Sequence, residues 1–484
     1  MGMKAGNALA VDDITAGSNV RNSRWPLASL CAATLLASLG TSIANVGLPT
    51  LAHAFGASFQ AVQWVVLAYL LAITTLIVGV GRLGDMLGRR RVLLVGLASF
   101  TLASALCGLA GSLGMLIAAR VAQGLGAAAM MALTLAFVAD TVPKEKTGSA
   151  MGLLATMSAI GTALGPSLGG MLISIADWRA LFFVNVPFAV LAGGLAWRYL
   201  PRDPARSAAA HTRFDFAGTL LLVLTLGAYA LAMTLGRGHF GLLNVALVLA
   251  AVVGVMSFVS VERRVTAPLI QLEMFRNAVL RKGLIASMLV MTVIITTLVV
   301  GPFYLSRGLG LDAATLGIVM SCAPATVALC GVPCGRLVDR LGAQRMGLLG
   351  LAGVSAGCVL LAVLPTRWGV PAYVLPLIVV AFHYALFQAA NNTAVMKDVA
   401  PKQRGATSGL LNLSRNLGLI TGASLMGAVF SFASNADDIT IASADAVAMG
   451  MRVTFAVAAV LVGAAFVVSL RYLTPASMVA GQVK

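Results

Sequence analysis

Long apolar segments alternate with short polar ones along the whole chain. Fourteen stretches of about twenty residues carry almost no charge, and each can cross about 30 Å of hydrocarbon as an α-helix whose backbone hydrogen bonds are satisfied internally. A transmembrane β-barrel would instead show weak alternation over short strands. The pattern therefore predicts an all-α integral membrane protein. The predicted spans cover residues 27–48, 61–80, 92–110, 115–138, 149–175, 181–200, 216–235, 241–261, 283–304, 315–334, 346–364, 374–395, 407–432 and 453–472.

Two polar connectors group these spans as six, two and six. We expect a polar N-terminal tail at 1–24, a first six-helix bundle at 25–200 and a second one at 283–472. Residues 201–282 hold the two additional helices with their flanking connectors, and residues 473–484 form a C-terminal tail.

The composition agrees with a membrane protein and argues against an enzyme. Of 484 residues, 59% are hydrophobic and only 10% charged, which is too little polar surface to cover a water-soluble globule of this size. The six cysteines all fall in apolar spans, without the spacing of a metal site or a redox pair. Because the chain also shows no phosphate-binding glycine loop and no nucleophile constellation, we expect no catalysis, no metal, no cofactor and no use of ATP.

The positive charges test the number of spans. With fourteen spans both tails lie on one side, and 26 of the 33 Lys and Arg fall in the tails and loops of that side, against five on the other. Since Lys and Arg concentrate in cytoplasmic loops, this bias predicts cytoplasmic termini and a multi-pass protein of the cell (inner, or cytoplasmic) membrane. The net charge of +17 then requires no nucleic-acid partner, because it lies in short loops beside anionic lipid headgroups.

A charged motif at residues 81–91 returns in the second half of the chain. Glycine, aspartate and glycine have the same spacing in both copies, and a third echo links residues 142–148 to 400–405. The aspartate can cap a helix N-terminus or pair with an arginine and so hold one conformation closed; the alternative is a solvated charge cluster that only fixes topology. These echoes predict two related halves. The motif residues are Gly81, Asp85, Gly88 and Arg89 in the first half and Gly335, Asp339 and Gly342 in the second.

The fifth span carries a row of small residues. Gly161, Gly165 and Gly169 are four apart and leave one helix face without side chains, while Pro166 bends the helix next to Gly170. Such a face suits either a seam between two moving halves or ordinary tight helix packing. We favour the seam.

Few ionisable groups lie at depth in the membrane. None of the sixteen Asp and Glu lies near the middle of a span, whereas His383 does, with Arg120 and Arg415 closer to the ends of theirs. Histidine titrates near neutral pH, and an intramembrane ionisable group suggests function. We therefore name His383 and Arg120 as candidates for proton coupling. The alternative for His383 is a neutral imidazole that is hydrogen-bonded between helices.

A central cavity without a carboxylate would suit a neutral, zwitterionic or anionic solute better than a lipophilic cation. Polar or amphipathic side chains within the spans are candidates for lining this cavity, although each could equally bond neighbouring helices together. These candidates are Asn45, Gln63, Trp64, Gln388, Asn391, Asn392 and Arg415.

Together these motifs resemble the major facilitator superfamily. Residues 81–91 are similar to its signature between the second and third helices, residues 161–170 to the motif of its antiporters, and Arg120 with Gln123, Gly124 and Gly126 to its fourth-helix motif. Residues 44–49, 178–179 and 185–187 resemble its fourteen-helix drug/proton antiporter branch. One feature departs from that branch. Gly40 stands in the first span where those antiporters usually carry an aspartate, so the usual proton-carrying carboxylate is missing.

The resemblance implies a major-facilitator-type fold, with two six-helix bundles that rock about a midplane site and the additional helix pair at the periphery. It also implies that Asp85 contacts the cytoplasmic end of the thirteenth span. We expect a monomeric secondary transporter that exports drugs or other amphipathic molecules and is driven by the proton gradient. Its partners would be a small-molecule substrate, protons and the bilayer. The alternatives are an exporter of an anionic metabolite or siderophore, a uniporter or importer on the same fold, and, more remotely, a non-transporting receptor or scaffold.

Overall fold

The structure is a computed structural model that describes residues 24–57, 59–203, 215–234, 241–265, 268, 270–311, 313–435 and 443–470. Within these residues it consists of helices joined by short connections, without strands. Most of the predicted tails, 1–24 and 473–484, lies outside the described residues.

Thirteen of the described helices are long and apolar enough to cross a membrane, and the shorter apolar helix α10 adds a fourteenth. The predicted all-α membrane fold is therefore confirmed. The first half contains α2 (Arg24–Val46), α3 (Leu48–Phe55), α4 (Phe59–Leu87), α5 (Arg89–Gly108), α6 (Leu113–Thr141), α7 (Thr147–Ile175), α8 (Ala180–Phe183) and α9 (Asn185–Tyr199). The remaining helices are α10 (Phe216–Thr234), α11 (Leu242–Glu262), α12 (Ala278–Phe303), α13 (Ala313–Leu341), α14 (Ala343–Val363), α15 (Val370–Met396), α16 (Arg404–Ser434) and α17 (Ala444–Leu470).

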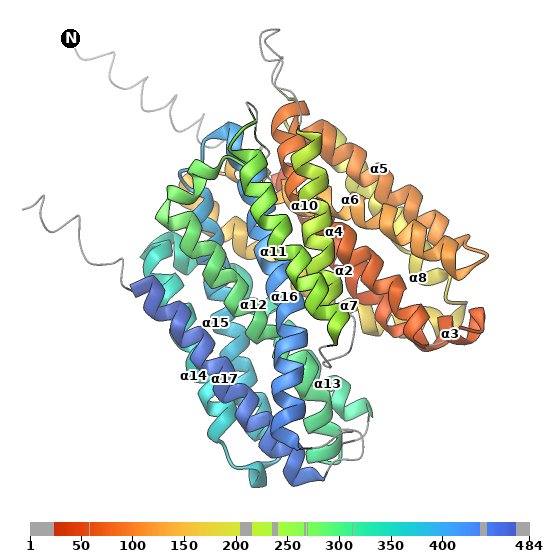
Figure 1. The fold of residues 1–484 in the computed structure, drawn as a ribbon, viewed down its shortest axis with the longest axis vertical. Coiled ribbons are helices and arrows are strands. Elements are labelled where there is room, and N and C mark those ends of the chain that lie inside the picture. Colours follow the sequence, from red (N-terminus) through yellow and green to blue (C-terminus); the bar gives the residue numbers. More distant parts are fainter. Residues whose placement is uncertain are drawn as a thin grey trace, which may run out of the picture.

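The helices form two bundles that meet along a seam (Figure 1). Helices α2 and α4–α9 pack together in the first bundle and α12–α17 in the second, and the seam is formed mainly by two pairs, α4 with α16 and α7 with α13. We name the end of the molecule that carries residues 81–91 and 335–342 the arginine-rich end. In Figure 1 the two bundles meet near this end and splay apart toward the opposite one.

The motifs at residues 81–91 and 335–342, which read as charged hinges in the sequence, are mostly helical. Helix α4 continues through Leu87 and α13 through Leu341, so both aspartates lie in the last helical turns. The chain breaks only at Gly88 (φ 103°) and Gly342 (φ 90°), in a backbone region that glycine reaches without the strain a Cβ would add. Each motif is therefore a rigid helix end followed by a one-residue turn.

Two further boundaries differ from the sequence-based expectation. The first apolar stretch is divided between α2 and the short α3, and the sixth is divided between α8 and α9. Hydrophobicity alone does not locate such breaks, which are marked instead by Gly47 and Pro49 at the first and by Asn185 and Pro187 at the second.

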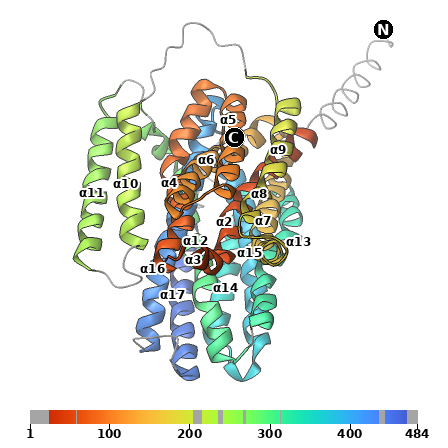
Figure 2. The same cartoon turned by 90° about the vertical axis from the view of Figure 1, so that its right-hand side faces the viewer.

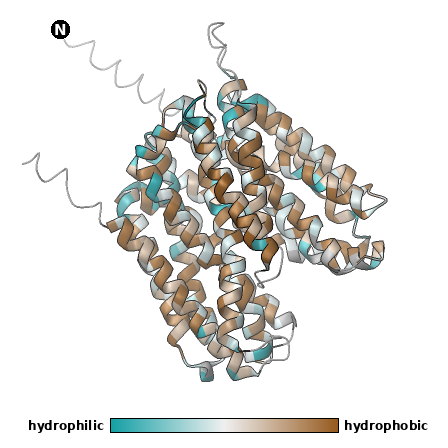
Figure 3. Cartoon of the chain, in the orientation of Figure 1, coloured by the Kyte–Doolittle hydropathy of each residue, from teal (hydrophilic) through white to brown (hydrophobic). Residues whose placement is uncertain are grey.

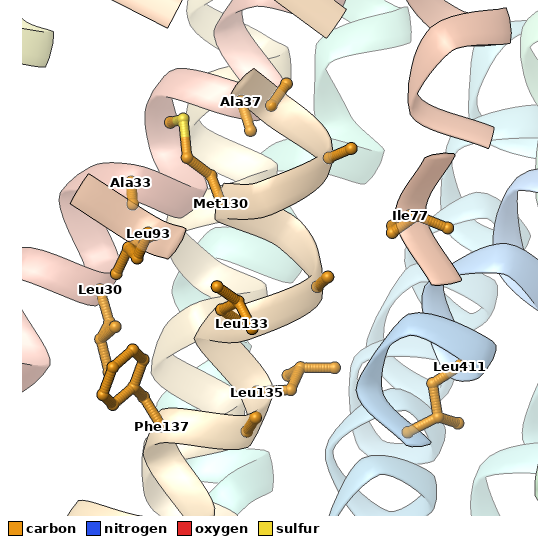
Figure 4. Packing of buried hydrophobic residues seen from close by; sticks show 14 of the residues in the cluster. Leu30, Ala33, Ala37, Ile77, Leu93, Met130, Leu133, Leu135, Phe137 and Leu411 are labelled. Carbon is orange, nitrogen blue, oxygen red and sulfur yellow. The ribbon is translucent and has the colours of Figure 1, made fainter. Parts of the chain in front are cut away.

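Hydrophobic residues run along the lengths of the helices, and hydrophilic ones gather mainly at the ends of the molecule (Figure 3). Helix α11 shows the lipid-facing pattern most clearly, since Leu242 is 88% exposed and Met256 66%. The buried core of the first bundle extends across the seam: Ile77 of α4 and Leu411 of α16 belong to one cluster (Figure 4). The second bundle has a further core of its own around Tyr373 and Phe455.

Helices α10 and α11 form a hairpin on the flank of the two bundles (Figure 2), as the resemblance implies. The hydroxyls of Tyr229 on α10 and Thr421 on α16 are hydrogen-bonded, and Ser424 of α16 donates to the carbonyl of Met233. Nearer the arginine-rich end, Thr219 of α10 lies against Gly79 of α4. The hairpin thus contacts both bundles at different depths.

Candidate functional site

Glycines bring the two bundles into backbone contact at the arginine-rich end. A Cβ atom on Gly81 would lie 2.4 Å from the carbonyl oxygen of Gly405, and one on Gly152 would lie 2.1 Å from that of Gly331. Gly335 likewise approaches Gly148 so closely that a Cβ would lie 2.3 Å from its carbonyl oxygen. Because real Cβ atoms do not approach backbone this closely, both pairs of seam helices require glycine here.

Asp85 caps the first residues of α16 across the seam. Its two carboxylate oxygens accept hydrogen bonds from the backbone nitrogens of Gly405 (2.9 Å) and Ala406 (3.0 Å), and its side chain is only 1% exposed. A carboxylate at a helix N-terminus satisfies backbone N–H groups that have no partner within the helix and interacts favourably with the helix dipole. The contact lies at the end of the thirteenth span, where the resemblance places it.

An arginine and a second aspartate extend this contact into a charged cluster. Arg89 binds Asp85 (2.8 Å), and its other terminal nitrogen pairs with Asp140 at the end of α6. Asp140 also pairs with Arg404 of α16, and Arg89 donates to the carbonyl of Pro401. Four charged side chains thus join the two bundles, and Asp140 links an arginine of each.

Asp339 repeats the cap in the second half with the bundles exchanged. It extends from α13 and accepts hydrogen bonds from the backbone nitrogens of Gly148 (2.7 Å) and Ser149 (2.8 Å) at the start of α7. The Ser149 hydroxyl adds a third bond at 2.5 Å. Each bundle therefore supplies one carboxylate to the N-terminus of a helix in the other.

The two caps differ in their charged surroundings. Arg89 follows Gly88 in the first motif, but Ala343 follows Gly342 in the second. The cluster of Arg89, Asp140 and Arg404 therefore reinforces one cap only. The difference between Arg89 and Ala343 is visible when the two motifs are compared in the sequence. Our sequence analysis considered only the residues that the motifs share and therefore missed it.

Asp203 makes a third cap, which sequence reasoning also missed. It follows α9 and accepts hydrogen bonds from the backbone nitrogens of Arg90 (3.0 Å) and Arg91 (3.1 Å) at the start of α5. A Cβ on Gly88 would lie 2.4 Å from this carboxylate, so Gly88 is required by space as well as by its positive φ. This cap fixes the turn after α4 within the first bundle.

The cross-bundle hydrogen bonds of the described residues are confined to the arginine-rich half of the molecule. Beyond the caps, Asn412 of α16 donates to the carbonyl of Met131 on α6 (3.1 Å), and Thr156 of α7 donates to that of Ala328 on α13 (3.2 Å). Farther from this end the bundles diverge (Figure 1). The structure is therefore closed at the arginine-rich end.

Arg120 is fully buried within the first bundle and joins three of its helices. Its guanidinium donates to the carbonyls of Val65 (2.8 Å) on α4 and Gly40 (3.1 Å) on α2, and to the side chain of Gln123 (2.5 Å) on its own helix α6. It also lies 4.1 Å from the ring centroid of Tyr69. In the described part of the chain, no carboxylate pairs with Arg120, and neutral acceptors hold it in place instead.

Sequence comparisons identify the family. The model of the Major Facilitator Superfamily matches residues 30–423 and 283–481. The chain belongs to the major facilitator superfamily. It is 32% identical over 428 residues to the uncharacterized transporter YebQ of Escherichia coli, covering 87% of this chain and 93% of YebQ.

A second relative indicates the branch of the superfamily. This facilitator is 32% identical to the multidrug resistance protein Stp of Mycobacterium tuberculosis over 81% of its own length and 73% of that of Stp. It therefore belongs to the drug-efflux-like branch that its motifs predict. Among solved structures, the proton:xylose symporter XylE shares the fold with a TM-score of 0.67 at 15% identity, over 94% of this chain and 96% of XylE.

The missing aspartate of the first span has a defined place in this facilitator. Gly40 accepts from Arg120 through its carbonyl, and a Cβ at this position would lie 3.1 Å from the Tyr69 hydroxyl. The position that usually carries a carboxylate in the antiporter branch is therefore beside the buried guanidinium. Here the backbone carbonyl takes its place as an acceptor.

The small face of α7 does not lie on the seam, so our preferred interpretation of it is wrong. Cβ atoms on Gly161, Gly165 and Gly169 would meet Leu35, Ser42 and Ile43 of α2, all within the first bundle. The seam uses Gly148 and Gly152 of the same helix instead. Spacing shows that a face is small, but it does not show which neighbour that face meets. Pro166 and Gly170 lie on the same stretch of α7.

His383 lies on α15, where it packs against α14 within the second bundle. Its Nδ1 is 2.8 Å from the carbonyl oxygen of Val379, and its ring packs edge-on against Phe382. On the other side, a Cβ on Gly353 would lie only 2.0 Å from the ring. The imidazole is therefore half-buried between two helices of one bundle, but its hydrogen bond is to its own helix and not between helices, as the alternative expected. Its role in proton coupling stays a prediction.

We expect Gly353→Ala to lower the melting temperature of the purified protein, because the added methyl group forces the His383 ring out of its position. Overpacking of this kind costs about 1–3 kcal/mol. Thermal unfolding in detergent measures the effect, and Gly347→Ala on the same helix is the control, since its Cβ would be 3.7 Å from that of Ala390. Adding His383→Ala should restore the melting temperature toward that of this single variant. A lower melting temperature that His383→Ala leaves unrelieved would contradict the account.

The remaining candidates for the cavity have different surroundings. Asn45 of α2 is exposed and donates weakly to the carbonyl of Thr41 (3.4 Å). Asn391 donates to the carbonyl of Gly283 (3.1 Å) on α12 and so bonds two helices together. Trp64 is half-buried on α4, which also carries Gln63, and Asn392 is buried on α15.

A cavity of about 360 Å³ lies between α4, α5 and α6, away from the seam. Its lining is apolar apart from Arg91 and includes Leu87, Val95 and Leu125, which are also exposed on the flank of the bundle. It is therefore not part of the central pathway. Among the described residues, no group of three or more His, Cys, Asp or Glu side chains gathers as metal ligands.

Proposed function

We propose that this chain is a proton-coupled exporter of amphipathic small molecules that works by alternating access. The observation that carries this proposal is the pair of related carboxylate caps, Asp85 on α16 and Asp339 on α7, which close one end of the seam while the bundles diverge at the other. A closure built from a few exchangeable hydrogen bonds between rigid bundles can open by rigid-body rotation.

The direction of transport and the orientation follow from two further arguments. The excess of Lys and Arg near the caps supports a cytoplasmic position for the arginine-rich end, and for both termini, in the inner membrane. The multidrug resistance protein Stp, at 32% identity, supports export of drug-like molecules. The seam and the space between the bundles lie within one chain, which supports a monomer as the working unit.

The proposed proton coupling has to work without the aspartate that the antiporter branch usually carries in its first span. With Gly40 in place of an acid, His383 and Arg120 are the ionisable groups at depth that remain, and the proton gradient is the proposed driving force without any further cofactor. A uniporter or an importer on the same fold is the second candidate, and the absent acid beside Arg120 favours it. A non-transporting scaffold is disfavoured because it has no need of two matched caps.

Liposomes that contain the purified protein test this proposal. With an acidic interior, we expect an amphipathic dye, tested in an anionic form (fluorescein) and a cationic form (rhodamine 6G), to accumulate in those vesicles whose protein is inserted with its arginine-rich end outside, and a protonophore should abolish the accumulation. Accumulation that follows only the dye gradient, at any pH difference, would identify a uniporter. Vesicles without protein give the background.

A further inference from the structure

Arg415 is a guanidinium within the second bundle that pairs with none of the described carboxylates. It lies eleven residues after Arg404, the first residue of α16. At about 1.5 Å per residue this is about 16 Å along the helix and about 12 Å from the start of the predicted span at residue 407, so Arg415 lies within the roughly 30 Å hydrocarbon thickness but not at its middle. Arg415 is half-buried and takes part in none of the ion pairs of the described residues, all of which lie at helix ends.

Two residues of α15 hold this guanidinium in place. When the Gln388 amide is oriented with its oxygen toward Arg415, that oxygen accepts from both terminal nitrogens (2.9 and 3.0 Å) while its nitrogen donates to the Tyr384 hydroxyl (3.1 Å). The Tyr384 hydroxyl is also 3.8 Å from the sulfur of Met291 on α12. Neutral groups thus fix the position of the positive charge but leave it uncompensated.

A second unused donor lies beside it. Asn416 is only 9% exposed, yet its side-chain nitrogen has no hydrogen-bond partner in the structure. Buried amide groups are rarely left unpaired, and one that is unpaired needs an explanation. Position 416 continues the row of Gly405, Gly409 and Asn412, the face of α16 that meets the first bundle. The unpaired amide therefore follows the last cross-bundle hydrogen bond of α16, where the two bundles begin to separate.

We propose that Arg415 and Asn416 form an anion-binding subsite, positioned by Gln388 and Tyr384, that takes the carboxylate or sulfonate of an amphipathic organic anion. An uncompensated guanidinium within the hydrocarbon is costly, and an anionic ligand group removes that cost through charge-assisted hydrogen bonds. The ligand would use both unfilled donors, whereas a lipophilic cation would be repelled. This subsite rests on the proposed transport function and assigns it a substrate class.

Two dyes with the same ring system and opposite charge test the subsite. Fluorescein is an organic anion at neutral pH and rhodamine 6G is a cation, and their binding to the purified protein can be followed by fluorescence anisotropy. We expect fluorescein to bind at least about tenfold more tightly than rhodamine 6G, because a charge-assisted contact is worth more than about 1.4 kcal/mol. Arg415→Gln should remove this preference, Arg415→Lys should keep part of it, and Asn416→Leu should weaken fluorescein binding alone.

Controls separate binding from folding. Arg367→Gln, at an exposed arginine outside the bundles, should change neither affinity. The Arg415 variants should elute as single species with the melting temperature of the parent, and the lysine variant tests the charge if the glutamine variant does not fold. Equal binding of the two dyes, no binding of fluorescein, or fluorescein binding that is unchanged in Arg415→Gln would each overturn the subsite.

The same variants distinguish this proposal from the proposed function. Proton-driven uptake of rhodamine 6G that does not depend on Arg415 would refute the subsite and leave proton-coupled transport standing. Arg415-dependent binding of fluorescein, without movement of either dye under a pH gradient, would support the subsite and refute proton-coupled transport.

Discussion

Replacing Gly152 by alanine is expected to open the seam at the arginine-rich end and to reduce transport by more than about tenfold. The added Cβ would lie 2.1 Å from the backbone carbonyl oxygen of Gly331, and a helix backbone cannot move aside as a flexible side chain can. Overpacking of this kind costs about 1–3 kcal/mol, which shifts a two-state equilibrium roughly 5- to 150-fold. The variant should therefore populate a conformation in which α7 and α13 are separated.

Spin labels at Glu145 and Arg336, two exposed positions beside this seam, measure the separation in a cysteine-free background. The distance distribution of Gly152→Ala should gain a longer component that is absent from the parent protein. Gly170→Ala on the same helix is the matched control, because a Cβ there meets nothing within 4 Å. Identical distance distributions for Gly152→Ala and the parent would show that the glycine contact does not hold the seam.

Asp85→Asn is expected to raise the ratio of open to closed protein about tenfold more than Asp339→Asn does. Both changes remove a charge that accepts backbone hydrogen bonds, at about 1.5–3 kcal/mol. Only the first also removes one of the two carboxylates that pair with the half-buried Arg89, since Ala343 takes the place of this arginine in the other half. Losing one further charge-assisted hydrogen bond costs about 1.5 kcal/mol, which is the expected difference between the variants.

Paired distances test this asymmetry directly. Labels at Leu87 and Lys397 report the seam between α4 and α16, and the Glu145–Arg336 pair reports the other seam. Asp203→Asn, which removes a cap within the first bundle, should leave both distances unchanged. If Asp85→Asn and Asp339→Asn open the seams equally, the charged cluster around Asp140 adds nothing to the closure.

Much of the fold could be predicted from the sequence, because hydrophobic length and charge bias are set by the bilayer and not by tertiary contacts. The number and order of the spans are examples, whereas the contact of Asp85 with the thirteenth span was expected only from the family resemblance. The breaks after Val46 and at Val184 were missed because the spans were drawn from hydrophobicity, although Gly47 and Pro187 beside them are turn signals. The helical form of the charged motifs was missed for a related reason: charged residues at a membrane surface read as a loop although the helix continues.

In the candidate site, too, local sequence revealed some features, while others depend on contacts between helices that are distant in the chain. Gly161, Gly165 and Gly169 revealed a small face, but its partner is set by the packing of α2, which spacing does not encode. Glycine pairs four apart at 148/152 and 331/335 were the true seam signal, visible in the sequence as matched pairs at corresponding helix ends. Asp140 and Asp203 could not be paired from sequence, because their partners lie 51 and 113 residues away.

The hairpin of α10 and α11 has a mechanical consequence. Its hydrogen bonds join it to α16 of the second bundle, while its packing against the first bundle uses non-directional apolar contacts, such as the Thr219 methyl group against Gly79 of α4 and Leu222 in the shared core cluster. Under alternating access the hairpin would therefore move with α16 and slide past α4, displacing lipid as it goes. Turnover would then depend on the viscosity and lateral pressure of the bilayer, so that the same chain would run at different speeds in fluid and in ordered membranes.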